Sequence, residues 1–141
     1  MQKKSTSDLH QDMMSHSDLN QFLSENRELF QHSTAQELLQ ELFDKKGISK
    51  AVLAKQSGMS EVYLHQVFSG RRNPSRSRIL CMCFGMHATM EETQDLLKKA
   101  GLAQLYPREK RDAIILYGLL HGMTLFEVND KLFVDDEEAL I

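Results

Sequence analysis

Residues 49–70 carry the pattern that most restricts how this chain can fold. Ser49 and Ser60 each precede a short run of helix-forming residues, and a serine hydroxyl at such a position accepts a hydrogen bond from an early backbone N–H. Gly58 stands between the two runs, where glycine allows the backbone of a tight turn. Apolar residues at helical spacing mark the inner face of the second run: Leu64, Val67 and Phe68. The pattern predicts two short helices joined by a tight turn, which is a helix-turn-helix unit.

The rest of the chain also shows helical spacing, and no alternating strand pattern competes with it. Only two prolines and seven glycines interrupt the 141 residues, and an apolar fraction of 41% is enough for a core. The expected helices after residue 33 begin at Thr34, Ser49, Ser60, Ser75, Thr89, Pro107 and Thr124. Three of these starts are threonines with a glutamate three residues later, which predicts capping boxes at Thr34, Thr89 and Thr124. We therefore expect an all-α fold.

The composition divides the chain into three expected parts. Residues 1–30 are a polar segment, partly disordered, in which residues 1–16 lack fixed structure. Within it, a short helix capped by Ser17 is expected to carry Leu19, Phe22, Leu23 and then Phe30. Residues 31–103 form the helix-turn-helix domain. Residues 104–141 form a C-terminal helical extension with an acidic tail, and its expected inward residues include Tyr117, Leu120, Leu132 and Phe133.

The charge of the chain is unevenly distributed. The net charge is −3, yet residues 34–78 carry eight basic and four acidic side chains, and residues 112–141 carry one basic and seven acidic. A local basic patch attracts phosphate whatever the overall sum. Arginines gather directly after the second helix of the unit, at Arg71, Arg72, Arg76 and Arg78. The alternatives are that this cluster only keeps a loop soluble, and that Arg78 pairs with an acidic side chain of the bundle.

A longer pattern runs from Leu53-Ala54 through Gly58, Ser60 and Leu64 to Val67-Phe68 and Gly70. From about Thr34 to Gly101 the chain resembles the phage lambda repressor and Cro (XRE-type) class of helix-turn-helix domains. The remainder resembles a helical pair appended to small regulators of Gram-positive bacteria. The resemblance implies a lambda-repressor-like bundle whose helix over residues 60–69 lies in the major groove of DNA, and dimers that read paired half-sites.

The resemblance also implies residue roles. Glu61, Val62 and Gln66 become the base contacts: Gln66 pairs with adenine, Glu61 accepts from cytosine, and Val62 touches a thymine methyl group. The implied phosphate contacts are Lys50, Ser60, Ser69, Arg71, Arg72 and Arg76. Relatives often carry glutamine in place of Lys50 and amides in place of Glu61 and Val62. Glu61 has a structural alternative, because a carboxylate in the first turn of a helix favours the helix dipole. Tyr63 either packs at the edge of the helix or reaches a phosphate.

Other chemistry finds little support in the residues. Cys81 and Cys83 lie two positions apart in a helical pattern, so they point to different faces and cannot easily share a metal ion with His87. We expect reduced core thiols in a cytoplasmic protein. No phosphate-binding loop, nucleophile motif or acid–base pair is present, and no apolar run approaches the roughly 20 residues that cross a membrane. The sequence therefore predicts neither an enzyme nor a cofactor or metal site.

Two functions remain open on the sequence. The first is a sequence-specific regulator of transcription, dimeric and of the repressor class, whose partner is double-stranded DNA. The alternative is a protein-interaction module, or an antitoxin-like accessory subunit, that keeps the repressor-like fold and binds a protein through the C-terminal helices. Lys50, Gln66 and the four arginines favour the first function, and Glu61 and Val62 favour the second.

Overall fold

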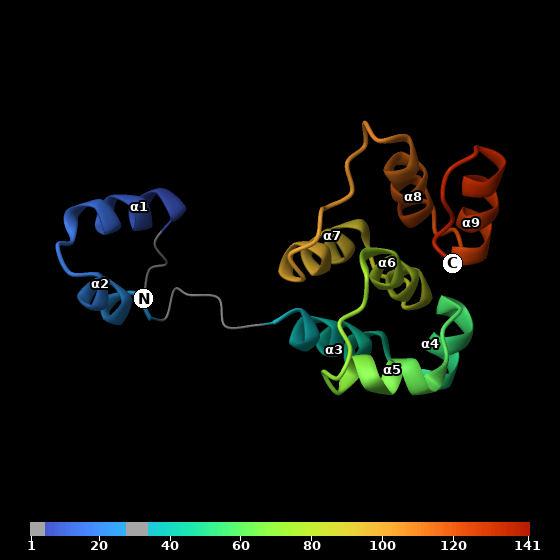
Figure 1. The fold of residues 1–141 in the computed structure, drawn as a ribbon, viewed down its shortest axis with the longest axis horizontal. Coiled ribbons are helices and arrows are strands. Elements are labelled where there is room, and N and C mark those ends of the chain that lie inside the picture. Colours follow the sequence, from blue (N-terminus) through green and yellow to red (C-terminus); the bar gives the residue numbers. More distant parts are fainter. Residues whose placement is uncertain (1–4, 28–33) are drawn as a thin grey trace. The chain divides into compact units, whose positions relative to one another are not determined.

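The computed structural model describes residues 5–27 and 34–141, and contacts divide the chain into two units, Met1–Ser33 and Thr34–Ile141 (Figure 1). In the first unit, α1 spans Thr6–Ser15 and α2 spans Leu19–Glu25. Ser5 caps α1 in a capping box with Asp8, so the expectation of no fixed structure is wrong for residues 5–16. Asp18, and not Ser17, caps α2, and Phe22 is its buried residue. The expected contribution of Phe30 lies outside the described residues.

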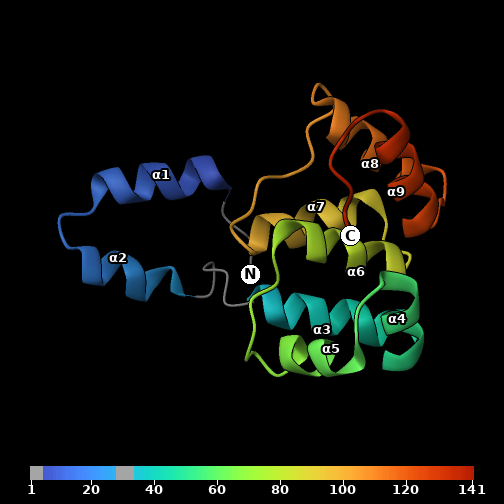
Figure 2. The ribbon, with the colours of Figure 1, turned by 45° about the vertical axis from the view of Figure 1, so that its right-hand side comes forward.

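The second unit is built from helices, and no strand occurs in residues 34–141 (Figures 1 and 2). Its elements in chain order are α3 (Ala35–Lys46), α4 (Lys50–Ser57), α5 (Glu61–Phe68), α6 (Arg76–Gly85), α7 (Met90–Lys99), α8 (Lys110–Leu120) and α9 (Leu125–Val134). Side-chain oxygens cap every one of these helices except α8. The all-α prediction is confirmed.

The predicted helix starts are confirmed where a side-chain oxygen caps the helix. Thr89 with Glu92 and Thr124 with Glu127 form the expected capping boxes. Thr34 Oγ1 accepts from the Glu37 N–H, which is one of the two bonds of the capping box predicted there. The prediction that a helix begins at Pro107 is wrong. Helix α8 begins three residues later, at Lys110, and Glu109 is its N-cap.

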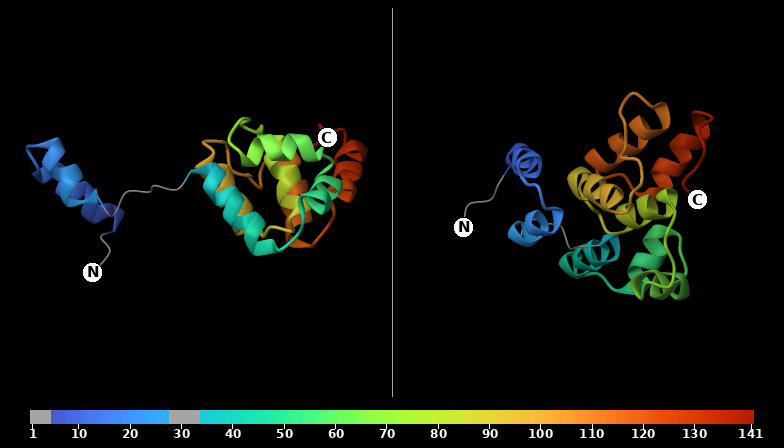
Figure 3. Two further views of the ribbon diagram at one scale, coloured as in Figure 1. Left: turned by 90° about the horizontal axis from the view of Figure 1, so that it is seen from below. Right: turned by 60° about the vertical axis from the view of Figure 1, so that its left-hand side comes forward.

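Helix α6 is the centre of the second unit (Figure 3). Its residues from Ile79 onward are buried, and α4, α7 and α9 pack around it. Gly85 lets α4 come close, since an added Cβ there would lie 2.9 Å from Leu53 Cδ1 and 3.0 Å from Ser57 Cβ. Burial raises the pKa of the Cys81 thiol to about 11 and that of Cys83 to about 12, so both are free, protonated core thiols near neutral pH.

The C-terminal helices pack on the same body. Leu140 is buried, and its N–H donates to Asn129 Oδ1 at 2.7 Å. Arg111 Nε donates to the main-chain oxygen of Glu138 at 2.7 Å, which holds the tail against α8. Contacts thus group residues 34–141 in one unit, and the boundary between residues 103 and 104 stays a prediction.

Three residues that were expected to face inward on these helices do not. Tyr117, Leu120 and Phe133 are exposed, because the sides of α8 and α9 that meet the core are those of Ile115, Leu116, Val128 and Leu132. In the described parts of the chain, no helix is long and apolar enough to cross a membrane, and no group of three His, Cys, Asp or Glu side chains is arranged to hold a metal ion.

Candidate nucleic-acid interface

The helix-turn-helix unit forms as its local residues predict. Ser49 Oγ accepts from the Val52 N–H and Ser60 Oγ accepts from the Tyr63 N–H, each at 3.1 Å. Gly58 ends α4 with φ of 68°, a left-handed conformation that a side chain disfavours. The chain then turns within two residues into α5.

Helix α5 offers one side to solvent. Leu64, Val67 and Phe68 are buried against the bundle, as predicted. On the other side Glu61, Val62 and His65 are exposed and Gln66 is half-buried. Val62 is 68% exposed, so its side chain is accessible to a partner. The three predicted base contacts therefore share an accessible surface.

The backbone around Gln66 is held firmly. Its carbonyl oxygen accepts from the Arg71 N–H at 2.9 Å, from the Arg72 N–H at 3.2 Å and from Ser69 Oγ at 3.1 Å. Two residues further along the chain, the Phe68 carbonyl accepts from Gln36 Nε2 at 2.9 Å, which ties the end of α5 to α3. The start of the arginine loop is thus folded back onto the end of α5.

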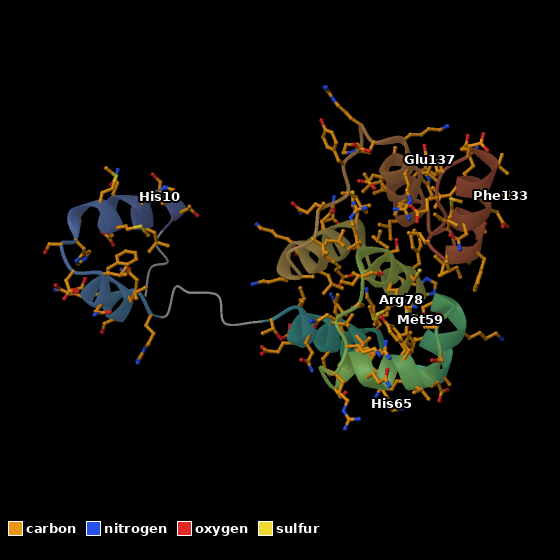
Figure 4. The ribbon with its side chains drawn as sticks, viewed as in Figure 1. His10, Met59, His65, Arg78, Phe133 and Glu137 are labelled. Carbon is orange, nitrogen blue, oxygen red and sulfur yellow. The ribbon has the colours of Figure 1, made fainter. Side chains whose placement is uncertain are left out.

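Lys50 and His65 meet beside this surface. Lys50 Nζ lies 3.2 Å from His65 Nδ1 and 5.6 Å from the centre of the Phe68 ring. Figure 4 shows His65 on α5, and the sequence pattern places it only on the outside of that helix. Its pairing with a residue of α4 depends on how the two helices cross, so no signal in the chain indicates it. Lys50 itself lies next to α5, where the resemblance implies a phosphate contact.

Two of the four arginines that follow α5 lie over the ring of Tyr63. Arg78 lies over the ring of Tyr63 at 4.4 Å from its centre, and Arg72 lies at 6.0 Å. These side chains line a hollow of about 410 Å³ together with Asn73 and Ser75. Tyr63 therefore packs under two cations, and Arg78 stacks on an aromatic ring where an ion pair was the alternative. A hollow walled by guanidinium, amide and hydroxyl donors is suited to hold a phosphate.

Arg76 points to a different place from the one implied. Its Nη2 lies 3.0 Å from Asp112 Oδ2, and its Nε donates to the Ala103 carbonyl at 2.8 Å. A second bond from Nη2 reaches the Gln104 carbonyl at 3.2 Å. Four hydrogen bonds from this guanidinium join α6 to α8 and to the loop before it, so Arg76 is not part of the candidate interface. The other implied phosphate contacts, Lys50, Ser60, Ser69, Arg71 and Arg72, lie on or beside α5.

The comparisons with known proteins agree with this geometry. Residues 37–96 match the model of a helix-turn-helix domain family. The matched range runs from α3 into α7 and contains α4, the turn and α5. Comparison with curated proteins found no match, and comparison with solved structures found none either. Residues 37–96 are therefore similar to a helix-turn-helix domain, and α8 and α9 lie outside the matched range.

Proposed function

We propose that this protein is a sequence-specific, double-stranded DNA-binding regulator of transcription that reads the major groove with α5. The observation that carries the proposal is that Lys50, Arg72 and Arg78 all lie against side chains of α5. Lys50 lies beside His65 and Phe68, and Arg72 and Arg78 lie over the ring of Tyr63. Glu61 is the acidic residue of α5. The match to a helix-turn-helix domain family supports the same function.

Within this proposal, different residues contact the bases and the phosphates. Gln66 pairs with an adenine through its amide, Val62 covers a thymine methyl group, and Glu61 accepts from cytosine N4. Lys50, Ser69, Arg71 and Arg72 hold the phosphates on the two sides of the groove, and the Ser60 hydroxyl keeps its proton free to donate to one. Arg78 replaces Arg76 among the proposed phosphate contacts, because it lines the hollow beside Tyr63.

The protein acts by occupying its site, with no chemistry of its own. A single α5 supplies few base contacts, so we propose a homodimer that reads two half-sites about one helical turn apart. We infer a repressor of the bacterial cytoplasm, which acts by occupying its operator.

Fluorescence anisotropy tests the proposal directly. The full chain is titrated against a labelled random-sequence duplex and a duplex of its own upstream region, at about 50 and 200 mM salt. We expect binding to both at low salt, tighter binding to the upstream region, and a log–log salt slope of about −4 per subunit for four phosphates. No binding to either duplex at low salt contradicts the proposal.

A further inference from the structure

A cavity lies between the start of α3, the loop that follows α5 and the end of α7. Its volume is about 360 Å³, which falls within the range of small-molecule sites in proteins, about 300–1,000 Å³. The apolar part of its lining is aliphatic. Half-buried members are Pro74 and Leu102, and buried members are Leu39, Val67, Ile79 and Leu96. The cavity is therefore suited to a hydrocarbon chain.

One wall of this cavity is fixed by contacts within the protein. Gln36 Nε2 donates to the Phe68 carbonyl at 2.9 Å, which joins α3 to the end of α5. Gly70 lets the loop after α5 come close to the same amide, since an added Cβ there would lie 2.8 Å from Gln36 Oε1. The shape of this wall is thus set by the fold, as is usual in binding sites for small molecules.

The charged residues that line this cavity are cations. Arg72 comes from the loop after α5, and Lys99 comes from the last turn of α7. None of the described residues that line the cavity is acidic, and Asn73 adds an amide. The ion pairs within the described ranges do not include Arg72. A guanidinium can bind a carboxylate through two parallel hydrogen bonds, so this lining matches a single carboxylate attached to a hydrocarbon chain.

We propose that this cavity binds a small aliphatic carboxylic acid in its ionised form. The hydrocarbon chain lies against Leu39, Ile79 and Leu96, and the carboxylate lies between Arg72 and Lys99. A neutral aliphatic molecule gains nothing from the two cations. An inorganic anion without a chain gains nothing from the apolar lining, because only an apolar surface is stabilised by leaving water there.

A second apolar hollow, the groove between α8 and α9, is less suitable for such an acid. Its volume is about 520 Å³, and its lining includes Lys110, Lys131 and Asp135. Both lysines already bond to the aspartate: Lys110 Nζ donates to its main-chain oxygen at 3.1 Å, and Lys131 Nζ lies 2.9 Å from its Oδ2. A carboxylate in this groove would meet the like charge of Asp135. The cavity beside Arg72 has no such opposing group in its lining.

Isothermal titration calorimetry of the full chain with octanoate, without DNA, tests the site. We expect saturable binding, and binding of octanamide that is weaker by about 10-fold or more, because the amide has the same chain without the charge. Lys99→Gln should weaken octanoate binding by about 10-fold and leave octanamide binding unchanged. Lys98→Gln is the matched control, because Lys98 is the preceding residue and does not line the cavity. Thermal unfolding followed by circular dichroism checks that both variants fold.

Three results of this titration would overturn the proposal. They are the absence of saturable octanoate binding, equal affinities for octanoate and octanamide, and a Lys99→Gln protein that folds and binds octanoate as the wild type does.

Amide NMR spectra recorded during the same titration test the location. The resonances of Gly70 and Leu102, which line the cavity, should shift as octanoate is added. Those of Tyr117 and Met123, which line the groove between α8 and α9, should stay in place. The reverse pattern would place the acid in that groove and overturn the assignment.

The site also adjoins the proposed DNA interface, and this last step rests on the proposed function. Arg72 lines both the cavity and the hollow beside Tyr63, so a guanidinium that holds a carboxylate is lost to a DNA phosphate. Saturating octanoate should raise the dissociation constant for DNA by about 5-fold or more, and octanamide should not. An unchanged DNA affinity would contradict this coupling. A protein that binds no DNA contradicts the proposed function instead, and leaves the calorimetric test of the site intact.

Discussion

Arg76 and Asp112 form an ion pair that fastens the first turn of α6 to α8. Nη2 of Arg76 lies 3.0 Å from Oδ2, and Nη1 lies 3.2 Å from Oδ1 of the same carboxylate. Asp112 also accepts from the Tyr106 N–H at 2.9 Å. The pair is largely shielded, since the side chains are 24% and 10% exposed. An arginine from the cluster that follows α5 thus serves the fold, and joins the C-terminal helices to the helix-turn-helix unit.

Replacing Asp112 by asparagine should therefore destabilise the protein without weakening DNA binding. Asp112→Asn leaves the guanidinium without its charge partner in a shielded place, which costs about 2–3 kcal/mol of unfolding free energy. Urea unfolding followed by circular dichroism measures this loss. Asp95→Asn, at an exposed carboxylate of α7, is the control and should change the free energy by less than about 0.5 kcal/mol. An Asp112→Asn protein as stable as the wild type would show that the ion pair contributes nothing.

Replacing Arg72 should weaken DNA binding, because Arg72, unlike Arg76, is part of the proposed interface. Arg72→Ala removes one cation from the hollow beside Tyr63, so every DNA sequence should bind more weakly and the salt slope should become less steep by about 0.9. Anisotropy titrations at several salt concentrations measure the slope. Lys98→Ala removes one positive charge from the last turn of α7 and serves as the control. Equal slopes for Arg72→Ala and Lys98→Ala would place Arg72 outside the DNA interface.

Gln66→Ala should reduce discrimination between sites rather than overall affinity. Loss of one bidentate base contact is worth about 1–3 kcal/mol between the preferred duplex and one with the contacted base pair changed. The bonds to the Gln66 main-chain oxygen survive the substitution, so the arginine loop keeps its place. Gln40→Ala on α3 is the matched control. If Gln66→Ala weakens all duplexes equally, Gln66 does not read a base.

Glu92 should make the stability of the protein depend on acid pH. Burial by itself raises the pKa of this carboxyl, but hydrogen bonds from Lys46, from the Thr89 N–H and from Lys45 outweigh burial and lower the pKa to about 2. The lysine nitrogens lie 2.8 and 3.0 Å from its oxygens and tie α7 to the end of α3. A carboxyl whose pKa is lowered by folding stabilises the protein above its unfolded-state pKa of about 4.5, and this stabilisation is lost as the pH falls towards 2.

Glu92→Gln tests this dependence while keeping a side chain that can still serve in the capping box. We expect a loss of about 1–2 kcal/mol at pH 7, after allowance for solvent screening around the exposed Lys45, and a loss that shrinks between pH 5 and about 2. Urea unfolding across that range measures the difference. Glu91→Gln, one residue away in the same first turn, is the control. A difference that stays constant with pH would mean that the charge of Glu92 contributes nothing.

Local signals in the sequence locate most of the helices. A serine or threonine cap bonds to a backbone N–H three residues away, so the starts at Ser49, Ser60, Thr89 and Thr124 are set by neighbours in the chain. The same holds for the turn at Gly58. Pro107 misleads because proline suits the first turn of a helix and also suits a loop, and only the hydrogen bonds of α8 distinguish the two.

The sequence by itself thus determined the helical class, the helix-turn-helix unit and the outward side of α5, since all three follow from spacing and from bonds within about four residues. The tertiary structure determined which residues that are far apart in the chain come into contact. It turned Arg76 towards Asp112, set Lys50 beside His65, and left Phe133 in solvent although its spacing suited a core. A period of apolar residues shows that a helix has a buried side, but the crossing of helices far apart in the chain determines how wide that side is.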